Sequence, residues 1–175
     1  MRRREFITLI GGAATAWPLA ARAQQKPMPV IGYLSARTPG DSVELLAEFR
    51  RGLAETDFVE GQNVAIEYRW LEGHNDRLQE MVADLVRRRV AVIVVPNNTA
   101  SALAAKAATQ TIPIVFNIGS DPVAMGLVAT ISHPGKNATG LTMQQTAVTA
   151  KRLELLHELV PTASTIAMLV NPNRR

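Results

Sequence analysis

The stretch "VAVIVVPNNTASALAAKAATQTIPIVF", residues 90–116, places two apolar segments on either side of an alanine-rich one. Residues 90–95 are apolar throughout, which is typical of a strand in a parallel sheet that is covered on both faces. Residues 99–110 are rich in alanine, the residue with the highest helix propensity, and residues 112–116 form a second apolar run. A strand, a helix and a strand in this order predict a βαβ unit with two parallel strands.

The same alternation continues on both sides of this stretch. Further strands are expected at residues 29–35, 63–70 and 165–170, with a strand-like segment at 141–143; helices are expected after Asp41, around 78–86, at 122–131 and at 148–160. Asp41 and Glu44 have the spacing of a capping box, and Asn75 or Asp76 can cap the next helix. The pattern predicts an α/β fold, an open parallel sheet with helices on both faces.

The length of 175 residues suits one domain and the beginning of a second, and 47% apolar residues predict a packed core. Most of the net charge of +4 lies in residues 1–23, where four arginines and Glu5 leave +3, so only +1 remains for residues 24–175. A nucleic-acid-binding domain needs a basic patch, so no nucleic-acid partner is expected. The basic run Arg87–Arg89 is expected to be a solvated helix end.

Residues 1–23 have the three parts of a secretory signal peptide: a basic start, an apolar run at 6–16, and the small-x-small site Ala21-Arg22-Ala23. The apolar run is shorter than the roughly 20 residues that a membrane span needs. The sequence "RREFI" resembles the twin-arginine export pattern, although an ordinary signal peptide also begins with arginines. We expect export, cleavage after Ala23 and a periplasmic protein without a lipid anchor, because the chain has no cysteine.

In open α/β sheets, ligands bind beyond the carboxyl ends of the strands. Three loops occupy such positions, at 35–40, 96–99 and 117–122. Their candidate ligand-binding residues are Ser35, Thr38, Asn97, Asn98, Thr99, Asn117, Ser120 and Asp121. Two of the loops lead into expected helix N-termini, which favour a carboxylate or another anion.

Several of these residues also have a purely structural interpretation. Asp121 with Pro122 suits the start of a helix, and either Asn98 or Thr99 can cap the helix that follows it. Asn117 ends an apolar strand, where its amide needs a partner from a ligand or from a neighbouring loop. The sequence leaves both interpretations open.

The sequence carries no motif of a catalytic or cofactor-binding site. It lacks the glycine pattern of a dinucleotide site, a Walker loop, an H-E-x-x-H pair and a G-x-S-x-G turn. His74, His133 and His157 lie far apart in the sequence, and there is no cysteine. We therefore expect no enzyme activity, no cofactor and no metal.

Five segments in order resemble one family: "IGYLS", "FRRGLAETDFVEGQNVAIEYRW", "ALAAKAATQTIPIVF", "SDPVAMGLVATISHPGKNATGLT" and "KRLELLHELVP". They are similar to the substrate-binding proteins of a widespread group of bacterial ABC importers, some of which handle aromatic amino acids. The resemblance runs from the signal peptide to the last residue. The segment "PNNTA" at 96–100 departs from the usual family pattern, in which a Thr-Pro-Ala sequence is common.

The resemblance implies a type I periplasmic binding fold, in which two flavodoxin-like α/β lobes close on a small solute. It places the first lobe at 24–145, and the crossover and the start of a second lobe at 146–175. The three loops would then line one wall of the cleft, and a permease in the inner membrane would be the protein partner. Because the family has a second lobe of similar size, the chain is expected to be truncated.

These inferences predict an exported solute-binding component of an ABC-type importer, whose ligand is an amino acid or another small carboxylate. The alternatives are an extracytoplasmic ligand-sensing module, an enzyme on the same scaffold, and a non-functional half-receptor.

Overall fold

The computed structural model describes residues 28–143 and 149–167. The expected signal peptide, residues 1–23, lies outside the described residues. So does half of the last expected strand, residues 168–170, and its described half, residues 165–167, has no strand structure.

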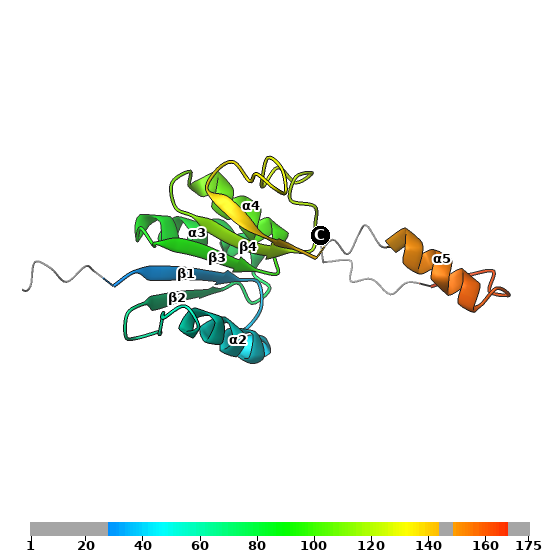
Figure 1. Ribbon diagram of the computed structural model, residues 1–175, viewed down its shortest axis with the longest axis horizontal. Helices are drawn as coiled ribbons and strands as arrows, with labels where there is room; N and C mark the ends of the chain where they lie inside the picture. The colour runs from blue at the N-terminus through cyan, green and yellow to red at the C-terminus, as the bar shows by residue number, and fades with distance from the viewer. Residues whose placement is uncertain (1–27, 144–148, 168–175) are drawn as a thin grey trace, which may run out of the picture.

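The fold is built on one sheet of five parallel strands in the order β2-β1-β3-β4-β5 (Figure 1). The strands are β1 (Val30–Ser35), β2 (Ala65–Trp70), β3 (Val92–Pro96), β4 (Ile114–Ile118) and β5 (Ala138–Thr142). The helices are α2 (Val43–Ala54), α3 (Leu78–Arg87), α4 (Thr99–Ala108) and α5 (Thr149–Leu159), with short 3-10 turns η1 (Gly40–Ser42) and η2 (Asn75–Arg77). This architecture confirms the predicted α/β fold class.

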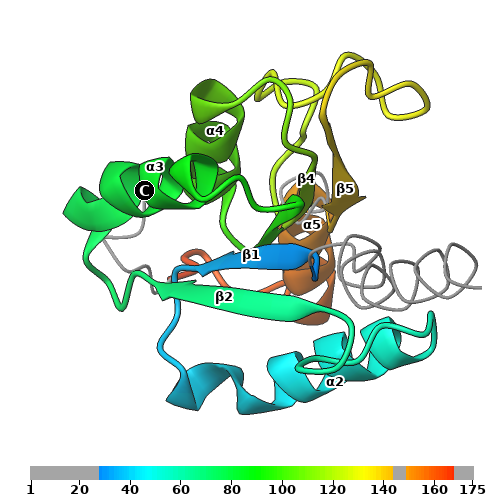
Figure 2. The same ribbon diagram turned by 90° about the vertical axis from the view of Figure 1, so that its left-hand side faces the viewer.

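Helices cover the sheet on both faces, but not equally. Figure 2 shows α3 and α4 on one side of the sheet and α2 on the other, beside β1 and β2. On the α2 side, Val115 and Leu141 remain 41% and 72% exposed. The expectation that residues 90–95 are covered on both faces is therefore only half right, since Val92 and Val94 are just partly buried.

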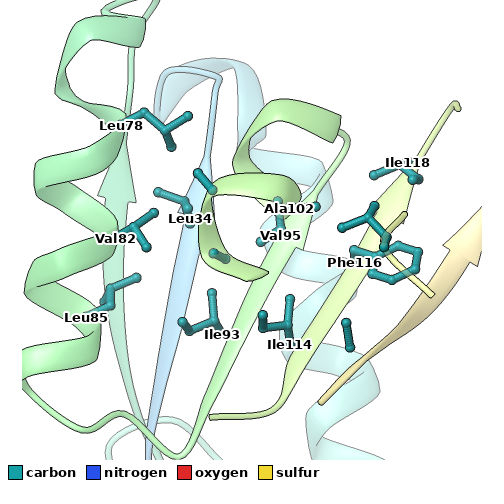
Figure 3. Packing of buried hydrophobic residues seen from close by; sticks show 14 of the residues in the cluster. Leu34, Leu78, Val82, Leu85, Ile93, Val95, Ala102, Ile114, Phe116 and Ile118 are labelled. Carbon is teal, nitrogen blue, oxygen red and sulfur yellow. The ribbon is translucent and has the colours of Figure 1, made fainter. Parts of the chain in front are cut away.

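The hydrophobic core lies between the sheet and the two helices α3 and α4 (Figure 3). Alternate strand residues point into it because side chains along a strand face opposite sides in turn. It includes Leu34, Val82, Leu85, Ile93, Val95, Ala102, Ile114, Phe116 and Ile118. Gly32 lets α3 approach β1, since a Cβ atom there would lie 2.9 Å from a methyl carbon of Leu85.

Aromatic side chains fill the opposite face under α2. The Tyr33 ring lies 5.3 Å from that of Phe49, 5.6 Å from that of Tyr68 and 5.7 Å from that of Trp70, measured between ring centroids. Tyr68 and Trp70 are stacked, as their positions two residues apart on one strand face allow. This cluster attaches α2 to β1 and β2.

Two predicted helix starts are wrong. Asp41 does not form a capping box with Glu44; instead its carboxylate accepts a hydrogen bond from the Thr38 hydroxyl at 2.7 Å, within the turn that precedes α2. Asn75 and Asp76 lie in η2, and α3 begins without a side-chain cap. In both places a 3-10 turn leads into the helix, so the α-helix starts later than its polar residues suggest.

The helix expected at residues 122–131 is also absent, and the segment consists of turns. One helical hydrogen bond forms, from the Met125 N–H to the Asp121 carbonyl at 3.0 Å. Gly126 then adopts a φ of +68°, which belongs to the left-handed region and ends a helical turn. The helix expected at 148–160 is present as α5, and the strand-like segment at 141–143 belongs to β5, which begins earlier.

A network of charged residues joins β2 to α3. The Asp84 carboxylate accepts hydrogen bonds from Arg69, Arg87 and Arg88, and Glu67 pairs with Arg69 at 2.7 Å and with Arg88 at 3.2 Å. Two arginines of the basic run therefore bind this carboxylate. The hydrogen bond from Arg69, more than the other contacts, holds the pKa of Asp84 below its usual value.

We predict that Asp84→Asn lowers the melting temperature by a few degrees at pH 7 and by less at pH 3. The pKa of Asp84 is lower in the folded protein than the value of about 3.9 in an unfolded chain. Its contribution to stability is thus complete above that pH and is lost as the pH falls through the folded-state pKa. Thermal unfolding of both proteins across this range tests the prediction, with Asp76→Asn on the exposed turn before α3 as the control. A constant difference between Asp84→Asn and the unmutated protein would contradict it.

Candidate ligand-binding site

The turn between β3 and α4 depends on Asn97, which follows the last residue of β3. Asn97 has a φ of +55°, a conformation that asparagine tolerates better than most residues with a side chain. Its N–H donates to the Asn117 carbonyl at 2.7 Å, which joins the ends of β3 and β4. The sharp turn brings the next residue directly to the start of α4.

Asn98 is the N-cap of α4. Its side-chain oxygen accepts a hydrogen bond from the Ser101 N–H at 2.6 Å, which confirms the capping interpretation for Asn98. The first N–H groups of a helix have no acceptor within the helix. With the Ser101 N–H bound to the cap, those of Thr99 and Ala100 remain for an external acceptor.

A cavity of about 440 Å³ lies beside this helix start. It is lined by Asn97, Asn98, Thr99, Ala100, Leu103, Ser120 and Met125. Ser120 comes from the loop after β4, and its hydroxyl lies 3.1 Å from that of Thr99. Thr142, at the end of β5, donates to the Ser120 carbonyl at 2.8 Å. The structure thus brings four predicted residues together at the carboxyl ends of β3 and β4.

Asp121 follows Ser120 but does not line the cavity. One of its carboxylate oxygens accepts hydrogen bonds from the Val123 N–H at 2.8 Å and the Ala124 N–H at 3.2 Å. The predicted capping role is therefore present, although it organises a turn rather than a helix.

Two other predicted residues, Ser35 and Thr38, lie in the loop after β1. The buried Ser35 hydroxyl accepts a hydrogen bond from the Arg37 N–H at 3.2 Å, and Thr38 is bound to Asp41. Neither residue lines the cavity at α4. Their contact with a ligand remains a prediction.

Asn117 lies on the opposite face of the sheet, in a second cavity of about 240 Å³. This cavity is largely apolar, and its lining includes Tyr33, Phe49, Val115 and Leu141. The Asn117 side-chain oxygen and the Tyr33 hydroxyl are both buried without a hydrogen-bond partner among the described residues. Burial also raises the pKa of Tyr33. Asn117 therefore lies on the other side of the sheet from the cavity that Asn97 and Asn98 line. Its contact with a ligand also remains a prediction.

Leu103 and Met125, which were not among the predicted residues, supply apolar side chains to the cavity at α4. The spacing of four residues between Thr99 and Leu103 places both on one helix face, so Leu103 could have been found. Met125 could not, because its segment was assigned to a helix that the structure does not contain.

The cavity at α4 can bind an anion through neutral groups. Its polar lining consists of amides, hydroxyls and a helix N-terminus, and no charged side chain lines it. The described part of the chain contains no group of three His, Asp or Glu residues placed to hold a metal ion. Among the same residues, no helix has the length and apolar character needed to cross a bilayer.

Comparison with solved structures supports the fold. A conserved domain protein from Vibrio cholerae has a TM-score of 0.67 and 27% identity, over 77% of this chain and 45% of that one. The ABC domain from Streptococcus pneumoniae in complex with L-Trp has a TM-score of 0.57 and 28% identity, and the match covers 65% of this chain and 38% of that one. The ligand-free, open form of a substrate-binding protein with adhesive properties from Clostridium difficile has a TM-score of 0.61 and 29% identity, over 77% and 45%.

Sequence comparison identifies the family. A tyrosine-binding protein of Clostridioides difficile is 31% identical over 123 residues, which cover 70% of this chain and 35% of that protein. This chain thus spans less than half the length of these relatives. A family model described as ABC transporter substrate binding protein matches residues 40–175. This chain therefore belongs to the ABC transporter substrate-binding proteins, a family of solute-binding proteins rather than of enzymes.

Proposed function

We propose that the chain is the exported solute-binding component of an ABC-type importer and that its cavity at α4 binds the carboxylate of an aromatic amino acid. The observation that carries this proposal is the helix start itself. The N–H groups of Thr99 and Ala100 have no acceptor within α4, and Ser120, whose hydroxyl lies 3.1 Å from that of Thr99, lines the same cavity.

The apolar part of the cavity suits the side chain of such a ligand. Leu103 and Met125 line the cavity together with the polar residues at the start of α4 and in the loop after β4. A methionine thioether makes favourable contacts with aromatic rings, and it adapts its shape to the ring. The named relatives support this choice, since one is a tyrosine-binding protein and another was solved with L-Trp.

The importer role rests on the family and on the sequence. Export through the twin-arginine route would remove residues 1–23 and release the protein into the periplasm, where it would deliver solute to a permease in the inner membrane. Residues 24–145 would form the first lobe of a two-lobed receptor, and residues 146–175 would lead into the second. A ligand pocket usually buries about 70–90% of its ligand. We therefore expect the first lobe alone to bind more weakly than a two-lobed receptor.

We predict that the chain binds L-tyrosine and L-tryptophan, and that tyramine, which lacks the carboxylate, binds at least about tenfold more weakly, a difference of 1.4 kcal/mol. Chemical-shift titration of the ¹⁵N-labelled protein measures both affinities and identifies the affected amides. The Thr99 and Ala100 signals should shift with the amino acids. Equal affinity for tyramine would exclude a carboxylate site at α4.

A pair of substitutions tests the side-chain contacts. Thr99→Val and Ser120→Ala should each weaken L-tyrosine binding about fivefold, since one hydrogen bond contributes about 1 kcal/mol. Both are small changes and should alter the melting temperature little. Thr111→Val, on the exposed turn after the other end of α4, provides the control and should leave affinity unchanged. If the control weakens binding as much as the two site variants, these hydroxyls do not form the site.

A further inference from the structure

One face of α4 contacts the loop after β4 at several points. Thr99, Leu103 and Lys106 follow the helical spacing of four and three residues, so they share that face. Thr99 meets Ser120, and Leu103 lines the same cavity as Met125. The Lys106 ammonium group donates to the carbonyls of Gly126 and Leu127, each at 2.6 Å.

The loop needs such an anchor because its backbone has little regular structure. Residues 119–131 contain no helix or strand, although Leu127 is fully buried in the core. The Gly126 and Leu127 carbonyls receive no other hydrogen bond within the described part of the chain. A hydrogen bond from a charged donor is stronger than one from a neutral donor, and an unpaired carbonyl on a buried residue such as Leu127 is costly.

The contacts form a closed ring that passes through the proposed ligand site. Met125 directly precedes Gly126, and its N–H donates to the Asp121 carbonyl at 3.0 Å. Asp121 follows Ser120, whose hydroxyl lies 3.1 Å from that of Thr99. The backbone of α4 completes the ring from Thr99 to Lys106. We therefore expect a displacement at Gly126 to shift both residues that the loop contributes to the cavity, Ser120 and Met125.

We propose that Lys106 is a positioning residue for the ligand site. By holding two carbonyls of the loop, it sets the separation between the start of α4 and the wall formed by Ser120 and Met125. Lys106 lines neither cavity, so it acts through the loop and not by contact with the ligand. The consequence for binding rests on the function proposed above, whereas the ordering of the loop does not.

A different role for Lys106 would be to complement the partial negative charge at the C-terminal end of α4. Any such effect would stabilise the helix and leave the loop unaffected.

Lys106→Met removes the charge and keeps the apolar stem, while Lys106→Arg keeps a cation that can donate to two carbonyls. Lys136→Met removes the same charge from an exposed site in the same connection and serves as the control.

Hydrogen–deuterium exchange followed by mass spectrometry tests the ordering of the loop without a ligand. Lys106→Met should raise amide exchange in residues 120–128 about tenfold, while exchange in α4 and the strands stays unchanged. Lys106→Arg should restore protection, and Lys136→Met should resemble the unmutated chain. Unchanged exchange in residues 120–128, or increased exchange confined to α4, would overturn the proposal.

Gly126→Ala disturbs the same loop through its backbone conformation and not through the Lys106 hydrogen bonds. A Cβ atom at Gly126 would meet no atom within 4 Å, so the substitution acts only through the φ of +68° that alanine disfavours. It should raise exchange in the same residues as Lys106→Met. Protection equal to that of the unmutated chain would show that the turn at Gly126 does not order the loop.

L-Tyrosine titration of the same variants tests the effect on the site. Lys106→Met and Gly126→Ala should weaken binding about fivefold to tenfold, and Lys106→Arg should recover most of the affinity. If the loop loosens but affinity is unchanged, the positioning role is wrong while the proposed function stands. If the unmutated chain does not bind L-tyrosine, the proposed ligand fails, and the exchange data alone decide whether Lys106 orders the loop.

Discussion

The hydrogen bond between the Asn98 side chain and the Ser101 N–H determines where α4 begins, and the candidate site depends on that position. Asn97 turns the chain sharply at the end of β3, and Asn98 stops the helix from extending backward. The N-terminus of α4 therefore lies at the edge where the parallel strands end. At that edge it meets the loop after β4, because β3 and β4 are neighbours in the sheet.

The connection from β4 to β5 shows how a loop can take the place of a helix. Leu127 and Val128 enter the core on the same face of the sheet as α3 and α4, but the backbone around them forms turn hydrogen bonds instead of a continuous helix. Side chains add further hydrogen bonds to this backbone. Asp121 accepts from the Val123 and Ala124 N–H groups, and Lys106 donates to the Gly126 and Leu127 carbonyls. Asn137, at the end of this connection, binds it to the segment before β4 by donating to the carbonyls of Thr109 and Ile112. An irregular segment thus gains a defined shape, which is what a binding wall requires.

Sequence reasoning predicted the parallel sheet, the elements from β1 to β4 and four residues that line the cavity, since those follow from local patterns. The apolar runs at β3 and β4 identify strands, and polar residues directly after a parallel strand must lie at the ligand edge. The prediction from sequence was wrong where contacts between distant segments determine the local conformation. Asp121-Pro122 has the local signature of a helix start, yet Gly126 ends the turn. Only the folded structure shows that the Lys106 ammonium group donates a hydrogen bond to the Gly126 carbonyl at this turn.

Asn117 illustrates a further limit. Its place after an apolar run suggests a residue of the ligand edge, but the alternation of side chains along β4 directs it to the α2 face with Val115. A shift of one residue would have placed it with the core residues Phe116 and Ile118. Which face a strand residue occupies depends on the register of the whole sheet, and a single apolar run does not reveal it.

The central claim is that the N-terminus of α4 binds the carboxylate of an amino acid. A crystal structure of the chain grown with L-tyrosine tests it most directly. The account predicts carboxylate oxygens within hydrogen-bond distance of the Thr99 and Ala100 N–H groups and of the Ser120 hydroxyl. Tyrosine bound in the apolar cavity lined by Tyr33 and Asn117, or a cavity at α4 that stays without ligand at saturating concentration, would contradict it.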